Sequence, residues 1–390
     1  MKRILIYSIS IIAFILLVTF LFGGEWTSRQ NVVEREGTPI QYNPVNLSYS
    51  SRPFAMGLTI MPPDVTPEAM NSVYDFNAQH ADFIYYHLEN GVPWQEAFEN
   101  TSLPSAVIKE WDDLKRKIPK GHKLYVSITP LDGKRENLAP YWGASQKMPL
   151  PAPWDTYALN DPSVKQAYLT YAQQVIEYFK PDYFSIGNEV NGLLVNHADR
   201  WEAYKDLHRF VYTMLKKDYP DLPIFATFMI GDIIGAMPQA DAELNRRELR
   251  ELLDYNDYVA LTVYPYTSNF RKPVPEDIFD VALSFGKPVA IAEAGYPSKD
   301  IVVRGITVLR FTEEDQYQFV ELLLRKAHEH RFPFVMYWQP IDYDKYLRKL
   351  PRGETKDLLA NWVYDGLQTS DGRFKKALYL WDAHLKLPKR

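Results

Sequence analysis

The chain has 390 residues, of which 46% are hydrophobic and 24% charged, which suits one large folded domain and excludes a disordered or fibrous protein. Its formal net charge is only −5 and no block of like charges occurs, so the charge pattern gives no indication of nucleic-acid binding and a neutral substrate fits better. Cysteine is absent, which excludes disulfides, thiolate nucleophiles, cysteine-based zinc sites and lipid attachment to an N-terminal cysteine.

The N-terminus has the pattern of a membrane anchor. Lys2 and Arg3 precede an uncharged run from Ile4 to Gly24, which is as long as the ~20 apolar residues of a membrane-spanning helix. Bulky residues precede its end where a signal-peptide cleavage site has small ones, so residues 1–24 are predicted to be an uncleaved signal anchor, with a cleaved signal peptide as the alternative. Residues 25–50 are polar and are predicted to be a linker. The rest of the chain, 51–390, is expected in the cell envelope outside the cytoplasm, anchored to the membrane or secreted if the segment is cleaved.

From residue 53 onward, short β-branched or aromatic runs alternate with helical patterns, which is typical of βα units around a parallel sheet. Eight strands close a barrel, so residues 51–390 are predicted to form a (β/α)8 TIM barrel. A doubly wound open sheet is the competing α/β fold, but its glycine-rich phosphate turn is not found. The predicted strands are Phe54–Met61, Asp82–His87, Lys123–Thr129, Tyr183–Gly187, Ile224–Met229, Tyr258–Tyr264, Pro288–Ala292 and Phe334–Trp338.

The helices between these strands have recognisable ends. The amphipathic segments Pro162–Phe179 and Glu313–His330 are predicted helices, and Thr66 and Thr312 are predicted N-caps because each hydroxyl precedes Pro or Glu. The pairs at 365–366 and 371–372 are Asp-Gly and are predicted turns before a closing helix.

Two glutamates follow apolar strands. Glu189 comes directly after strand four and Glu293 at the end of strand seven. The active sites of such barrels lie at the C-terminal ends of the strands, so both carboxylates are expected at the barrel mouth. Two carboxylates suit the cleavage of a glycosidic bond, because one can attack the anomeric carbon while the other, kept protonated, protonates the leaving oxygen.

The residues around this pair resemble glycoside hydrolase clan A, and the C-terminal half is most similar to the family 53 endo-β-1,4-galactanases. The matching runs are GNEVNGLL at 187–194, VYPY at 263–266, EAGYP at 293–297 and YWQP at 337–340. The resemblance implies a retaining hydrolase of β-glycosidic bonds with Glu189 as acid/base and Glu293 as nucleophile. It also implies that Asn188 binds the sugar 2-hydroxyl, that Tyr264 holds the nucleophile and that Trp338 forms the floor of the sugar subsite.

The N-terminal half departs from the galactanases. They carry an Asp-His-Tyr-Ser run at strand three, where residues 127–132 read SITPLD, and an Arg-x-Trp-Asn type of run at strand two, where residues 86–89 read YHLE. The resemblance therefore supports the reaction more than the substrate.

Two further residues are predicted to bind substrate. His87 ends strand two, where it can hydrogen-bond sugar hydroxyls or the nucleophile, a structural histidine being the alternative. Trp142 lies in the long segment from Pro130 to Asn160, which is expected to shape substrate subsites or to form a lid packed by its own aromatic rings. Glu89 and Asp132 lie just beyond strands and are interpreted as loop caps.

No metal or other cofactor is expected. His328 and His330 are two apart on a predicted helix and point to different faces, and neither an H-E-x-x-H nor a G-x-S-x-G motif occurs. The expected partner is a carbohydrate, with no nucleic acid and with membrane contact only through the N-terminal helix. Two alternatives use the same scaffold: a transglycosylase, in which an acceptor sugar replaces water, and a membrane-tethered carbohydrate-binding protein without turnover.

Overall fold

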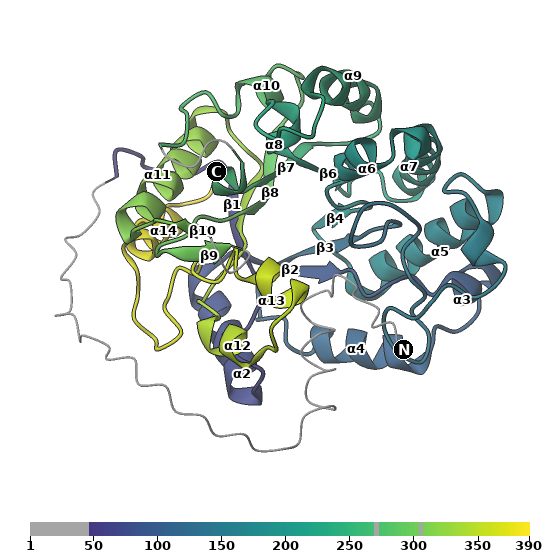
Figure 1. Ribbon diagram of the computed structural model, residues 1–390, viewed down its shortest axis with the longest axis horizontal. Coiled ribbons are helices and arrows are strands. Elements are labelled where there is room, and N and C mark those ends of the chain that lie inside the picture. The colour runs from purple at the N-terminus through teal and green to yellow at the C-terminus, as the bar shows by residue number, and fades with distance from the viewer. Residues whose placement is uncertain (1–46, 269–272, 304–306) are drawn as a thin grey trace.

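The computed structural model describes residues 47–268, 273–303 and 307–390, and its centre is a parallel sheet that closes on itself (Figure 1). The sheet has nine strands in the order β5-β4-β3-β2-β1-β11-β8-β7-β6. The two edge strands, β5 and β6, follow each other in the chain with only Ala226 between them, so they are two parts of one strand and the sheet forms an eight-stranded barrel.

All eight predicted strands are confirmed, and every pair in the barrel is parallel. Their bounds are β1 Ala55–Thr59, β2 Phe83–Leu88, β3 Lys123–Ile128, β4 Tyr183–Ser185, β5 Ile224–Phe225, β6 Thr227–Met229, β7 Val259–Val263, β8 Val289–Ala294 and β11 Phe334–Tyr337.

Helices surround the barrel (Figure 1). In the described residues the α-helices are α2 Pro67–His80, α3 Trp94–Glu99, α4 Ser105–Lys115, α5 Pro162–Phe179, α6 Asn191–Asn196, α7 Trp201–Asp218, α8 Ile230–Ile233, α9 Ala242–Leu253, α10 Asp280–Leu283, α11 Glu313–Glu329, α12 Asp344–Lys349, α13 Glu354–Leu359 and α14 Lys376–Leu385. Short 3₁₀ helices lie at Trp154–Thr156, Ala198–Arg200 and Pro265–Thr267, and an antiparallel hairpin pairs β9 Ile301–Val303 with β10 Thr307–Leu309.

The predicted helix starts are also confirmed. The Thr66 side chain accepts a hydrogen bond from the N–H of Ala69 at the start of α2. Thr312 forms a capping box with Asp315 at the start of α11. In both places a side chain satisfies backbone N–H groups that have no partner within the helix, which stabilises each N-terminus by about 1 kcal/mol.

The core has two parts. Inside the barrel, aromatic rings from successive strands fill the space, among them Phe83, Tyr125, Phe225 and Phe334, so the barrel is a packed core and not a pore. Apolar residues of the outer strand faces pack against the helices in a second, larger cluster. Together they hold the strand ends, and the loops that follow them, in fixed positions.

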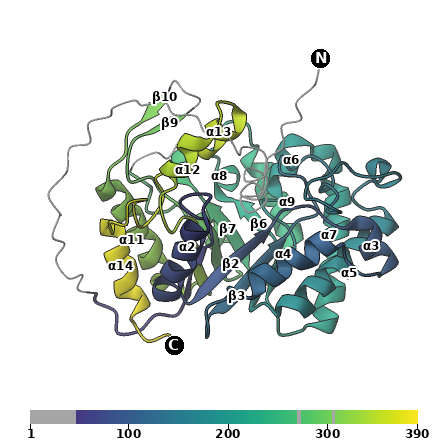
Figure 2. The ribbon, with the colours of Figure 1, turned by 90° about the horizontal axis from the view of Figure 1, so that it is seen from below.

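The loops on the C-terminal side of the barrel are long. Figure 2 shows α6, α13 and the β9–β10 hairpin on the side of the molecule opposite to the C-terminus. Residues 129–153 connect β3 to the 3₁₀ helix before α5, and α12 and α13 are inserted between β11 and α14. These segments form the walls of the site.

The predicted signal anchor and most of the linker, residues 1–46, lie outside the described residues. Within 47–268, 273–303 and 307–390, no helix is both long enough and apolar enough to cross a membrane.

Candidate active site

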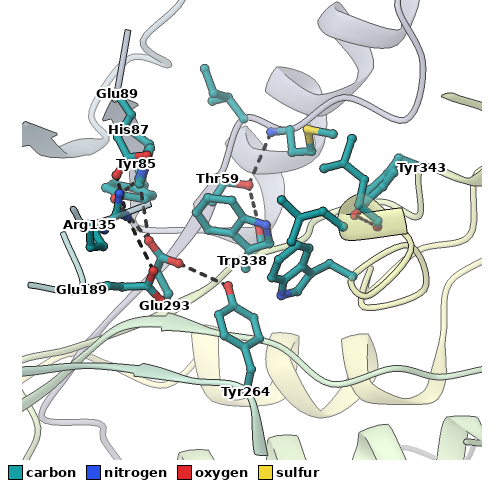
Figure 3. Close-up of a pocket in the computed structure, with 15 residues that line it drawn as sticks. Thr59, Tyr85, His87, Glu89, Arg135, Glu189, Tyr264, Glu293, Trp338 and Tyr343 are labelled. Atoms are coloured by element: carbon teal, nitrogen blue, oxygen red, sulfur yellow. Dashed lines mark hydrogen bonds and ion pairs between the residues drawn. The ribbon is translucent and has the colours of Figure 1, made fainter. Parts of the chain in front are cut away.

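A pocket of about 180 Å³ opens at the C-terminal ends of the barrel strands (Figure 3). Its lining comes from eight parts of the chain and includes both predicted catalytic carboxylates. The lining residues are Thr59, Ile60, Met61, Tyr85, His87, Glu89, Arg135, Glu189, Tyr264, Glu293, Trp338, Tyr343, Leu358, Leu359 and Trp362.

Glu293 lies inside β8 near its end and is only 7% exposed. The hydroxyl of Tyr264 donates to its Oε2 at 3.3 Å, and the hydroxyl of Tyr85 lies 3.5 Å from its Oε1. Burial raises the pKa of Glu293 well above its ordinary value, and the charge of Glu189 raises it further. The contact with Tyr264 that the resemblance implied is therefore present.

Glu189 follows β4 and has a left-handed backbone conformation, with φ of 47°. Such a conformation costs a residue other than glycine about 1 kcal/mol or more, and it persists only where neighbouring groups hold it. Here the hydroxyl of Thr227 accepts the N–H of Glu189 at 2.8 Å, and the hydroxyl of Thr262 donates to Oε1 at 2.9 Å. The strained backbone directs the carboxylate into the pocket, as strain at functional sites often does.

The two carboxylates face the same space (Figure 3). Thr262 links them, because it donates to Glu189 and is the register partner of Glu293 across β7 and β8. Since the negative charge of Glu189 favours the protonated form of Glu293, the pair retains a proton at pH values where isolated glutamates are ionised. A pair of carboxylates that share one proton can supply one acid and one nucleophile.

Arg135 is a site residue that the sequence did not indicate. It is 8% exposed, and its Nη2 lies 2.7 Å from Oε1 of Glu89 and 3.6 Å from Oε2 of Glu189. The interpretation of Glu89 as a loop cap is therefore wrong. Burial alone would raise the pKa of Glu89, but Arg135 and then His87 outweigh it and hold this pKa well below its ordinary value.

His87 lines the pocket as predicted and connects the two sides of the site. Its Nε2 lies 3.3 Å from Oε2 of Glu89, and its Nδ1 lies 2.5 Å from the Tyr85 hydroxyl and 3.7 Å from Oε1 of Glu293. A continuous series of polar contacts thus runs from Glu189 through Arg135, Glu89, His87 and Tyr85 to Glu293.

Aromatic and apolar side chains form the rest of the pocket. Trp338 follows β11 and contacts His87 edge to face, with ring centroids 5.7 Å apart. Trp362, which comes just after α13, contacts Tyr264 in the same way at 6.0 Å. The pocket therefore combines flat rings with a few hydrogen-bonding groups, which suits a sugar ring with one apolar face and polar edges.

Two predicted contacts differ from expectation. Asn188 is fully buried and is not among the lining residues; its Nδ2 lies 3.3 Å from the Ser127 hydroxyl and 3.4 Å from Glu89. Trp142 is also fully buried and belongs to the outer core cluster. The structure thus corrects the prediction that Trp142 lines the substrate site, because its ring is buried in the core and is not among the residues that line the pocket.

Some of the missed residues had a signal in the sequence. Side chains of a strand alternate between its two faces, so residues two positions apart lie on the same face. Because His87 was predicted to face the pocket, Tyr85 could have been predicted there too, and Thr262 likewise from Tyr264. Arg135 and Trp362 had no such signal, because both lie in irregular segments without periodicity.

The part of the chain that the structure describes contains no group of three or more His, Asp or Glu side chains suited to a metal ion. The polar groups of the pocket contact one another instead, in the series described above.

Known proteins share part of the sequence pattern and the fold of this chain. The sequence pattern of glycosyl hydrolase family 53 matches residues 140–371, more than half of the chain. The matched part contains Glu189, Tyr264, Glu293 and Trp338, whereas Arg135 lies before it. No curated protein matches the sequence.

Solved structures show the same fold at low sequence identity. GH5_18 from Streptomyces cattleya in complex with GlcNAc has a TM-score of 0.57 at 16% identity, over 87% of this chain and 83% of that chain. The exo-beta-1,4-mannosidase Op5Man5 from Opitutaceae bacterium strain TAV5 has a TM-score of 0.58 at 14% identity, over 90% of this chain and 62% of that chain.

Proposed function

Because the chain belongs to glycosyl hydrolase family 53, we propose that it is a retaining glycosidase that cleaves β-glycosidic bonds of a neutral oligo- or polysaccharide by double displacement. The observation that carries this proposal is the buried Glu293, held by Tyr264 and facing Glu189 across one pocket.

The first step starts from the form of the pair in which the shared proton is on Glu189 and Glu293 is ionised. An oxygen of Glu293 attacks the anomeric carbon and forms a glycosyl ester. The bond from that carbon to the leaving oxygen breaks, and Glu189 gives its proton to that oxygen. Tyr264 orients the attacking carboxylate, and its hydrogen bond favours the ionised form of Glu293.

In the second step, Glu189 is ionised and accepts a proton from water while the water oxygen attacks the anomeric carbon. The ester bond breaks and Glu293 leaves as a carboxylate, so the configuration at the anomeric carbon is retained after two inversions. Thr262 stabilises the ionised form of Glu189 in this step through its hydrogen bond to Oε1.

For the substrate, we propose a β-1,4-linked galactan or a related neutral polymer. The support is the similarity of the C-terminal half to the endo-β-1,4-galactanases. The departures lie at residues 86–89, which include His87 and Glu89, and at residues 127–132. His87 and Glu89 line the pocket with the carboxylates, so the departure there is expected to adjust which sugar is accepted.

The test is a screen of purified domain, starting at Ser51, against aryl β-glycosides and β-linked polysaccharides that include galactan. Glu293→Ala and Glu189→Ala test the two proposed roles, and Glu68→Ala, at an exposed position of α2, is the matched control. Release of sugar by the wild type and Glu68→Ala but not by Glu293→Ala supports a hydrolase. Binding of a polysaccharide without release by any protein would instead support a carbohydrate-binding protein.

We also propose that the protein acts on the outer side of a membrane, held there by its N-terminus. The support is the uncharged run from Ile4 to Gly24 after Lys2 and Arg3. Membrane fractions from cells that express the full chain should retain the protein after carbonate extraction, and external protease should digest it in intact spheroplasts. Full chain in the cytosolic fraction would contradict this location.

A further inference from the structure

A second cavity lies beside the catalytic pocket. It has a volume of about 420 Å³ and is lined by the segments 129–140 and 147–150, together with Gly91 and Asp155. Glu89 lines both cavities, and Arg135, which lines the catalytic pocket, lies between Lys134 and Glu136, which line the second one. The two cavities are therefore neighbours on either side of the Glu89–Arg135 ion pair.

The position of this cavity suits a substrate longer than one sugar. In Figure 3, Glu89 and Arg135 lie on one side of the two catalytic carboxylates and Tyr343 lies on the other. Tyr343, Leu358 and Trp362 line the catalytic pocket itself and not the second cavity. A saccharide bound over the carboxylates can thus extend past Glu89 into the second cavity.

The walls of the cavity are held by hydrogen bonds to several elements. Asp132 accepts the N–H of Glu136 at 2.9 Å, and Arg200 donates to the carbonyl of Glu136 at 2.6 Å. Asn196, at the end of α6, donates to the carbonyl of Lys134 at 2.8 Å. On the other side of the cavity, the backbones of Tyr141 and Met148 pair with each other. Because these contacts tie the walls to several elements, binding costs little loop ordering.

The chemistry of the lining favours an uncharged, hydroxyl-rich ligand. Four of its residues are acidic, namely Glu89, Asp132, Glu136 and Asp155, and two are basic, Lys134 and Lys147. Burial lowers the pKa of Lys147 to about 7, which weakens the positive charge further. An anionic sugar such as a uronate is therefore disfavoured. Leu131, Leu138, Met148 and Leu150 add apolar surface to the lining.

We propose that this second cavity is a binding subsite for at least one further neutral sugar unit of the substrate, and so determines the chain length that the enzyme prefers. The inference rests on the proposed glycosidase function. None of the described residues that line the cavity is aromatic, so the sugar is held by hydrogen bonds and apolar contacts and not by stacking on a ring. Its segment 129–139 also lies outside the part of the chain that matches family 53, so the subsite is expected to differ from one relative to another.

The experiment compares two kinds of substrate of the sugar that reacts best in the screen above, galactose being the first to be tried. One is the p-nitrophenyl β-glycoside of a single sugar, and the other is the β-1,4-linked oligosaccharide series of that sugar. Leu150→Trp and Met148→Trp fill the cavity, and Asp155→Ala removes one polar group from its rim. Ala144→Trp adds the same bulk at an exposed position of the same loop, outside the cavity.

We expect kcat/KM to rise with oligosaccharide length in the wild type and in Ala144→Trp. In the two filled variants, kcat/KM for the longer oligosaccharides should fall about 10-fold or more, while kcat/KM for the aryl glycoside stays within about twofold, because remote binding energy is lost and the reacting groups are untouched. Asp155→Ala should show a smaller loss of the same kind.

Unchanged kcat/KM for long oligosaccharides in all three variants would overturn the subsite. An equal loss on both substrates in the folded variants would also overturn it, because that pattern indicates a disturbed catalytic centre. If the wild type cleaves no member of the screen, the proposed function itself fails, and the inference fails with it.

Discussion

Nη2 of Arg135 lies 2.7 Å from Oε1 of Glu89, and both side chains are largely buried at the edge of the catalytic pocket. The two residues come from the loops after β2 and β3, and their ion pair joins these loops. Because Arg135 also lies 3.6 Å from Glu189, the pair connects the structure of the N-terminal half to one of the two proposed catalytic groups.

Removal of Arg135 should destabilise the protein. In Arg135→Met, Glu89 is left buried without its cation, which typically costs roughly 3–5 kcal/mol of unfolding free energy. The double variant Arg135→Met/Glu89→Gln should recover much of this loss, because no buried charge remains unpaired. Urea unfolding of the three proteins measures both values.

Arg116→Met is the control, because Arg116 pairs with Asp113 at the surface, where such a pair contributes little. Equal unfolding free energies of Arg135→Met and Arg116→Met would show that the Glu89–Arg135 pair does not stabilise the fold.

The buried carboxyl of Glu293 should make the protein less stable as pH rises. Its pKa in the folded protein is raised well above the ordinary value of 4.5, so between these two pKa values the folded state holds a proton that the unfolded state releases. Stability from this group is present below the unfolded pKa and is lost as pH rises through the folded pKa, by about 1.4 kcal/mol for each unit of difference.

Glu293→Gln lacks this titration, so its unfolding free energy should exceed that of the wild type by an amount that grows from pH 4.5 to pH 8. Glu68→Gln, at an exposed position, should show no such growth. A difference between Glu293→Gln and wild type that is constant or shrinks with rising pH contradicts the raised pKa.

Loss of the Glu189 charge should change the pH profile of the first step. The charge of Glu189 raises the pKa of Glu293, so Glu189→Gln should lower it. With an aryl glycoside whose leaving group needs no acid, kcat/KM depends on ionised Glu293. The acid limb of the profile should therefore move to lower pH in this variant, and a limb that stays in place or moves upward would count against the coupling.

The strands could be predicted from the sequence because each is a short apolar run between turn signals. The position of the two carboxylates at the barrel mouth could be predicted because each directly follows such a run. Arg135 could not, because its contact with Glu89 joins residues 46 positions apart in two irregular loops. The position of Trp142 in a loop at the barrel mouth predicts a contact with substrate. A loop as long as 129–153 must also be held in place, and the buried ring of Trp142 anchors it to the outer core.

Substitution of Thr262 tests the acid/base role of Glu189. Its hydroxyl donates to Oε1 of Glu189 at 2.9 Å, and a hydrogen bond to a charged group contributes roughly 1.5–3 kcal/mol. Thr262→Val should therefore lower kcat about 10-fold or more. Substrates with poor leaving groups should be affected most, because they depend on the proton from Glu189.

Thr156→Val, at an exposed threonine whose hydroxyl bonds to the carbonyl of Pro153, should leave kcat unchanged. A loss in Thr262→Val that is the same for good and poor leaving groups would assign Thr262 to folding and not to Glu189.

The most direct test of the proposed mechanism is to trap its covalent intermediate. A 2,4-dinitrophenyl 2-deoxy-2-fluoro-β-glycoside of the preferred sugar forms the glycosyl-enzyme but slows its hydrolysis, and mass spectrometry of the intact and protease-digested protein locates the attached sugar. We predict one sugar per chain, attached to Glu293, and none on Glu293→Ala. Attachment to Glu189 would reverse the two roles. Turnover of the natural substrate with inversion of the anomeric configuration and no trapped ester would contradict the double displacement itself.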